Sequence, residues 1–116
     1  MTLPVAPPVA PMLAKLASEI PAGDWWLYEP KWDGFRALAW SAPIRLDSRN
    51  HKPLLRYFPE LIPSLEALPA ETVVDGEVVV VTGDRLDFDA LQNRLHPAAA
   101  RVNRTAVSER TIVLFL

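Results

Sequence analysis

The sequence predicts an α+β fold in which short, mostly antiparallel strands pack against a few short helices. The first observation behind this prediction is a β-branched run from Thr72 to Thr82, with shorter strand-like stretches before it. The second is that the segments with helical apolar spacing are short and are bounded by several of the 12 prolines. With 116 residues, half of them apolar, the chain is one small domain or part of a larger one.

The first half of the chain should hold one helix and three strands. Four prolines predict an extended lead-in over residues 1–11. Apolar residues in 12–20 have the spacing of a short helix, which Pro21 and Gly23 would end. Strands are expected at 25–28, 35–40 and 44–48, with the tight turn Asp33-Gly34 between the first two.

The second half predicts two helices around the β-branched run. Pro59 suits the first turn of a helix whose apolar face continues to Leu68. Residues 86–95 have helical spacing, with Asp87 as the N-cap. A connector over 97–110 and an apolar strand over 111–116 complete the chain.

Composition excludes several classes of protein. The chain has no cysteine, which rules out disulfides and cysteine-based metal sites. No apolar run approaches a membrane span and no signal peptide is recognisable, so a cytoplasmic chain is expected. The net charge of −2 is uneven, because residues 1–57 carry +2 and residues 58–116 carry −4. A basic segment contains Arg45, Arg49, Lys52 and Arg56; it is either a phosphate-facing patch or a solvated loop.

The stretch Glu29-Pro30-Lys31-Trp32-Asp33-Gly34-Phe35-Arg36 has the clearest chemical content. Lysine is a poor nucleophile while protonated, and at an ordinary pKa of about 10.4 only about one molecule in a thousand is neutral at pH 7. Desolvation by neighbouring aromatic residues and the charge of Arg36 are expected to favour a neutral, nucleophilic Lys31. The alternative is a surface hairpin whose Lys31 and Asp33 point to water.

Two acids interrupt the valine run at Asp75-Gly76-Glu77. Burying two carboxylates without a partner is costly, so these residues should face a site, a cation or solvent at a turn. An ordinary hairpin is the alternative to a site.

The pattern Lys-x-Asp-Gly-x-Arg arises by chance only about once in a thousand chains of this length. It resembles the adenylation motif of the covalent nucleotidyltransferases, which include ATP-dependent DNA ligases, RNA ligases and capping enzymes. Further motifs narrow the resemblance to the C-type bacterial ATP-dependent DNA ligases, which serve in repair. They are Pro-Met-Leu-Ala at 11–14, Ser-Arg-Asn at 48–50, Arg-Tyr-Phe-Pro-Glu-Leu at 56–61, Val-Asp-Gly-Glu at 74–77 and Leu-Asp-Phe-Asp-Ala-Leu-Gln at 86–92.

The resemblance implies a set of site residues. Lys31 would be the catalytic nucleophile, forming lysyl-AMP, and Glu77 would contact the ribose or the metal. The implied ATP-binding residues are Glu29, Lys31, Arg36, Arg49, Glu77 and Phe115, with Glu29 and Phe115 on the adenine and Arg36 on the ribose or phosphates. The implied DNA-binding residues are Arg49, Lys52 and Arg56. ATP, Mg²⁺ or Mn²⁺, nicked double-stranded DNA and other repair proteins are the implied partners, in the bacterial cytoplasm at the nucleoid.

The sequence also departs from that family. The family continues the last strand with an Asp after Phe115, where this chain has Leu116. The later acidic metal motif, the lysine motif that grips the α-phosphate and the oligonucleotide-binding domain are not present in the sequence. Since nucleotidyl transfer depends on positioning and charge neutralisation, residues 1–116 are expected to be the N-terminal portion of the adenylation domain and not to seal nicks alone. An RNA ligase or capping enzyme, and a non-catalytic nucleic-acid-binding fragment, are the rival interpretations.

Overall fold

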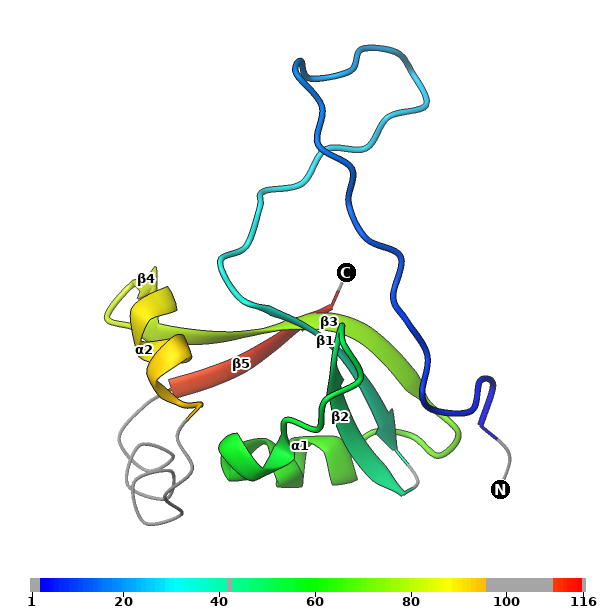
Figure 1. Cartoon of the computed structure of the whole chain (residues 1–116), viewed down its shortest axis with the longest axis vertical. Coiled ribbons are helices and arrows are strands. Elements are labelled where there is room, and N and C mark those ends of the chain that lie inside the picture. Colours follow the sequence, from blue (N-terminus) through cyan, green and yellow to red (C-terminus); the bar gives the residue numbers. More distant parts are fainter. Residues whose placement is uncertain (1–2, 42, 96–109, 116) are drawn as a thin grey trace.

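The computed structural model describes residues 3–41 and 43–95, together with the backbone of residues 110–115. Its centre is an antiparallel sheet in the order β2-β1-β3-β4, with β5 also paired to β3 (Figure 1). The strands are β1 (Phe35–Ser41), β2 (Ile44–Ser48), β3 (Val73–Thr82), β4 (Arg85–Leu86) and β5 (Arg110–Phe115). The helices are η1 (Leu55–Tyr57), η2 (Pro59–Leu61), α1 (Ile62–Glu66) and α2 (Phe88–Asn93).

The long strand β3 joins the two halves of the sheet. It pairs with β1 through Val73–Val78 and with β5 through Gly76–Val81. The hairpin alternative for Asp75-Gly76 is therefore wrong, because these residues continue one ten-residue strand. The β-branched side chains on both sides of Gly76 favour this extended backbone.

One face of the sheet carries the hydrophobic core. Because side chains alternate along a strand, Ala37, Val78 and Val80 point to this face. They pack against buried residues of the helical segments, Leu54, Phe58, Leu61, Leu65 and Leu91. The opposite face, called here the site face, carries Arg36 and its cross-strand neighbours.

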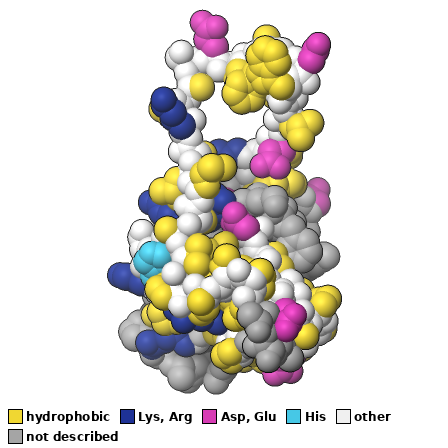
Figure 2. Space-filling model, turned by 90° about the vertical axis from the view of Figure 1, so that its right-hand side faces the viewer, with side chains coloured by type: hydrophobic (Ala, Val, Ile, Leu, Met, Phe, Trp, Pro, Cys, Tyr) yellow, Lys and Arg dark blue, Asp and Glu magenta, His cyan; other side chains and the backbone are white. Residues whose placement is uncertain are grey.

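Residues 12–34 form an extended arm that rises from the sheet (Figure 1), and two predicted elements within it are wrong. Residues 12–20 are not helical, and 25–28 pair with no strand among the described residues. Apolar side chains along the arm are largely exposed, for example Leu16 at 96% and Leu27 at 97%, and hydrophobic side chains also gather on the projecting part in Figure 2. A short helix without a surface to bury its apolar face is marginal in water, and the arm offers no such surface here.

The remaining elements follow the sequence closely. Strands over 35–40 and 44–48 are confirmed, as are the helical segments that begin at Pro59 and Phe88. Asp87 caps α2, because its carboxylate accepts the backbone N–H of Ala90 at 3.0 Å. The strand expected over 111–116 is present as β5, which begins one residue earlier at Arg110, and the rest of the connector expected over 97–110 lies outside the described residues. No helix in the described part of the chain has the length and apolar character to span a membrane.

Candidate adenylation and DNA-binding site

An arginine and two acids meet on the site face of the sheet. The strand register places Arg36 opposite Glu77, with Asp75 two residues before Glu77 on the same face. Asp75 accepts two hydrogen bonds from Arg36, at 2.7 Å from Nε to Oδ1 and 2.7 Å from Nη2 to Oδ2. These bonds, ahead of the charges of Asp75 and Glu77, raise the pKa of Arg36 above its usual value despite partial burial. The partner of Arg36 is therefore Asp75 on β3 and not the acid nearest to it in the sequence, Asp33.

Glu77 is left with an unused acceptor. Its Oε2 atom is buried and has no hydrogen-bond partner among the described residues. Burial raises the pKa of Glu77, and the positive charges of Arg36 and Lys31 offset this only in part. A buried oxygen without a partner suits a donor that the chain does not provide, such as a ribose hydroxyl or a metal ion.

The raised pKa of Glu77 predicts a stability that depends on pH. Between the usual pKa of glutamate and the raised one, the folded chain binds more protons than the unfolded chain, so the stability falls as pH rises. Glu77→Gln is therefore expected to increase the free energy of unfolding at pH 7, with the gain vanishing below about pH 4. Urea titrations of wild type and variant across this range measure the difference.

Glu66→Gln is the control for this prediction, because Glu66 is exposed on α1 and should show no such pH-dependent gain. A Glu77→Gln chain that is less stable than wild type at pH 7, or a difference that does not change with pH, would contradict the burial argument.

A compact loop after β2 presents two of the predicted DNA-binding residues. The Ser48 hydroxyl accepts the backbone N–H groups of Asn50 at 3.3 Å and Lys52 at 3.2 Å, and the Ser48 N–H donates to the Lys52 carbonyl at 2.8 Å. His51 completes the turn with a φ of 64°. Arg49 and Lys52 are exposed on this loop, and neither forms an ion pair among the described residues. Their charges are available to an anion.

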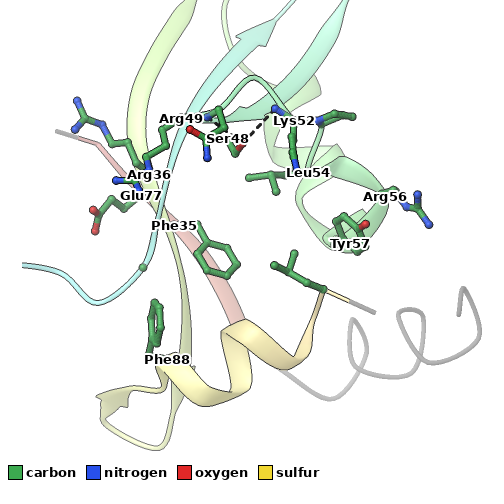
Figure 3. A pocket seen from close by; sticks show the side chains of 14 residues that line it. Phe35, Arg36, Ser48, Arg49, Lys52, Leu54, Arg56, Tyr57, Glu77 and Phe88 are labelled. Carbon is green, nitrogen blue, oxygen red and sulfur yellow. Dashed lines mark hydrogen bonds between the residues drawn. The ribbon is translucent and has the colours of Figure 1, made fainter. Parts of the chain in front are cut away.

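One pocket extends from this loop to Arg36 and Glu77 on the strands. It has a volume of about 760 Å³ and lies between β1, the loop after β2, η1 and α2 (Figure 3). Arg36, Arg49 and Glu77 lie at one side of it, and Lys52, Arg56 and Tyr57 lie at the other, with Phe35 between them and Phe88 below on α2. The pocket therefore brings together Arg36, Arg49, Lys52, Arg56 and Glu77, five of the residues singled out from the sequence.

Lys31 and Glu29 lie on the arm, outside the lining of this pocket. Both are exposed, so the desolvation expected around Lys31 is not found in the described part of the chain. Their charges nevertheless act on the Glu77 carboxyl, which places the arm within electrostatic range of the site face. Lys31, the predicted nucleophile, is thus exposed and lies within electrostatic range of Glu77.

Two further predicted residues have distinct places. Arg45 does not join the basic patch, because it pairs with buried Asp47 at 2.7 Å and lies over the Trp40 ring. Phe115 lies in β5, and its backbone pairs with Gly76 of β3, the residue before Glu77. Its stacking on adenine remains a prediction.

Comparison with known proteins identifies the family of this chain. The family model described as the ATP dependent DNA ligase domain matches residues 11–116. The chain belongs to this family. All the residues of the pocket and the site face lie within the matched region.

The similar curated proteins are longer than this chain. It is 50% identical to DNA ligase C2 of Mycolicibacterium smegmatis and 49% identical to DNA ligase C of Mycobacterium tuberculosis, in each case over the whole chain and 32% of the relative. It is also 38% identical to the multifunctional non-homologous end joining protein LigD of Pseudomonas aeruginosa, over 73% of the chain and 10% of that protein. The chain therefore spans about a third of the DNA ligase C relatives.

Sequence reasoning missed two features of this ATP-dependent DNA ligase chain. It listed Glu77 but not Asp75 among the site residues, although Asp75 is the residue that holds Arg36. It explained Gly34 by a tight turn, whereas Gly34 has no positive φ and instead lies against β3. The two-residue spacing of Asp75 and Glu77 signals a shared face, but the partner on that face depends on strand register.

Proposed function

We propose that this chain is the N-terminal part of the adenylation domain of a DNA ligase that seals nicks through a lysyl-AMP intermediate. The observation that carries the proposal is the pocket lined by Arg36, Arg49 and Glu77 at one side and by exposed Lys52 and Arg56 at the other (Figure 3). A nucleotide held by the first group and a DNA backbone held by the second would meet within one cavity. Family membership supports this assignment.

The first step is nucleotidyl transfer to lysine. The neutral Nζ of Lys31 attacks the α-phosphorus of ATP, the N–P bond forms, and the P–O bond to pyrophosphate breaks with its electron pair leaving on pyrophosphate. AMP then passes to a 5′-phosphate at a nick, and a 3′-hydroxyl displaces AMP to close the strand. Arg36 binds the ribose or phosphates, and Glu29 and Phe115 bind the adenine.

A divalent cation, Mg²⁺ or Mn²⁺, would neutralise phosphate charge when bound. Glu77 is the residue proposed to hold it or the ribose, since its buried Oε2 has no partner among the described residues. Those residues include no cluster of three or more metal-binding side chains. One carboxylate is nevertheless compatible with Mg²⁺, which usually keeps several waters and binds phosphate oxygens directly.

Intact mass spectrometry after incubation with ATP and Mg²⁺ tests the proposal. The full-length protein that contains this sequence is expected to gain the mass of one AMP, and Lys31→Ala is expected to abolish the gain. Lys15→Ala is the matched control, because Lys15 is an exposed lysine on the same arm and should leave the gain unchanged. The 116-residue chain alone is expected to gain nothing, since Lys31 is exposed and no described side chain bonds to it.

Other outcomes distinguish the rival functions. A full-length protein that seals nicked RNA but not nicked DNA would instead be an RNA ligase. A protein that gains no AMP but binds DNA in a salt-sensitive way, lost in Arg49→Ala with Arg56→Ala, would be a nucleic-acid-binding module. An AMP gain that survives Lys31→Ala would place the nucleophile elsewhere.

A further inference from the structure

We propose that Arg94 is a positioning residue that sets the place of Arg56 and Tyr57 at the rim of the pocket and thereby controls how tightly DNA is held. The inference rests on the proposed ligase function. Arg94 is the C-cap residue of α2, and its side chain has no exposed surface. Its Nη2 atom donates to the Tyr57 carbonyl at 3.0 Å and to the Glu60 carboxylate at 2.7 Å.

Burying a guanidinium is costly, which makes this choice of residue informative. The charge requires partners, and Arg94 has the Glu60 carboxylate, a backbone carbonyl and the Phe58 ring, whose centroid lies 4.8 Å from its guanidinium carbon. An apolar residue of similar volume would fill the same space without that cost, and such replacements are often neutral or stabilising. A role in fixing geometry accounts for the arginine better than a role in filling the core.

The contacts of Arg94 fix a segment that has little support of its own. The helix η1 has three residues and no side-chain cap, and the chain turns at Phe58 before η2 begins. Arg94 bonds on both sides of this turn, at Tyr57 and at Glu60. The planar guanidinium fork is suited to holding two acceptors at one angle.

The fixed segment carries a cation at the rim of the pocket. The Arg56 guanidinium carbon lies 4.9 Å from the centroid of the Tyr57 ring, and both residues line the pocket (Figure 3). Leu95, which follows Arg94 directly, lines the pocket from the α2 side. Arg94 therefore connects the α2 wall of the pocket to the η1 wall. A shift of its contacts would move Arg56 away from a bound phosphate.

The test uses the full-length protein and two assays, which are nicked-duplex binding over a range of salt and AMP transfer without DNA. Arg94→Met keeps the volume and removes both bonds. The displaced Arg56 would lose its contact with a phosphate, so DNA binding is expected to weaken about tenfold, the usual effect of losing one hydrogen bond to a charged group. The magnitude of the slope of log K against log salt should fall by about 1. AMP transfer in the absence of DNA should change less than about threefold, because the bonds that Arg94→Met removes go to Tyr57 and Glu60, which are not among the predicted nucleotide-binding residues.

Coupling to Arg56 separates positioning from a purely structural role. If Arg94 acts through Arg56, the pair Arg94→Met with Arg56→Ala should bind DNA no more weakly than Arg56→Ala alone. Fully additive losses, an unchanged salt slope, or equal losses in AMP transfer and DNA binding would each overturn the proposal. Arg94→Lys, which keeps the charge but cannot span both acceptors, provides a folded variant with the same expectations if Arg94→Met does not fold. A wild-type protein that transfers no AMP would refute the ligase function instead, and the coupling in DNA binding would still be measurable.

Discussion

Asp75→Ala is expected to lower the rate of AMP transfer to Lys31 about 100-fold, the scale of loss that a displacement of about 1 Å in a catalytic site produces. The reason is that the carboxylates of Asp75 and Glu77 compete for the Arg36 guanidinium. Asp75 holds the guanidinium by two 2.7 Å bonds, while the strand register places Glu77 directly opposite Arg36. Without Asp75, the free Glu77 oxygen would become the nearest acceptor, and Arg36 and Glu77 would neutralise one another instead of binding the nucleotide. Single-turnover AMP transfer by the full-length protein measures the loss.

A double-mutant cycle tests whether Asp75 acts through Arg36. Arg36→Ala with Asp75→Ala should be no slower than Arg36→Ala alone, because the carboxylate then has nothing left to position. Asp84→Ala is the matched control, since Asp84 lies exposed in the turn between β3 and β4 and should keep wild-type rates. Additional loss in the double variant would mean that Asp75 has a separate role, such as binding the substrate or a metal.

Gly34→Ala is expected to destabilise the chain by about 1–3 kcal/mol, which is the usual cost of overpacking. A Cβ atom at Gly34 would lie 2.5 Å from the Val78 carbonyl oxygen and 2.7 Å from Cγ1 of Val79. The carbonyl belongs to the backbone of β3, so relief requires Gly34 itself to move, and Phe35 would lose its pairing with Val78. Because Lys31 lies only three residues earlier, AMP transfer should fall as well, by about 100-fold. Urea unfolding and single-turnover kinetics measure the two effects.

Gly83 supplies the comparison for that substitution. Gly83 has a φ of +63°, and no atom lies within 4 Å of the position that a Cβ would take there. Gly83→Asn therefore meets open space in a conformation that asparagine tolerates. It should cost less than about 1 kcal/mol and leave AMP transfer unchanged. If Gly34→Ala were as stable and active as Gly83→Asn, close approach to β3 would not be the reason for glycine at position 34.

Local patterns were sufficient for much of the fold. The valine run predicts β3, alternating residues predict β1 and β2, and Asp87 marks the start of α2, because each signal depends on neighbours within a few residues. The same reasoning failed for residues 12–28. Their apolar spacing describes a helix and a strand only when another surface covers them, and in this structure the arm is exposed.

The candidate site also has features that the sequence predicts and features that depend on the fold. The motifs predict Arg36, Arg49, Lys52, Arg56 and Glu77 as site residues, and all five line the pocket. The strand register determines that Arg36 pairs with Asp75, 39 residues away, and not with the nearby Asp33. The buried ion pair between Arg94 and Glu60 depends on how the helices pack, and no local spacing in the sequence predicts it.

Short ordered motifs are enough to place the chain among the ATP-dependent DNA ligases and to predict its nucleophile, cations and acids, because each motif lies within a few residues. Which of these groups come together depends on the three-dimensional fold. The pairing of Arg36 with Asp75, the close approach of Gly34 to β3 and the burial of the Glu77 Oε2 atom all depend on how distant strands align. A shift of one residue in that alignment would turn every side chain of a strand to the other face, so the site exists only at one register of the sheet.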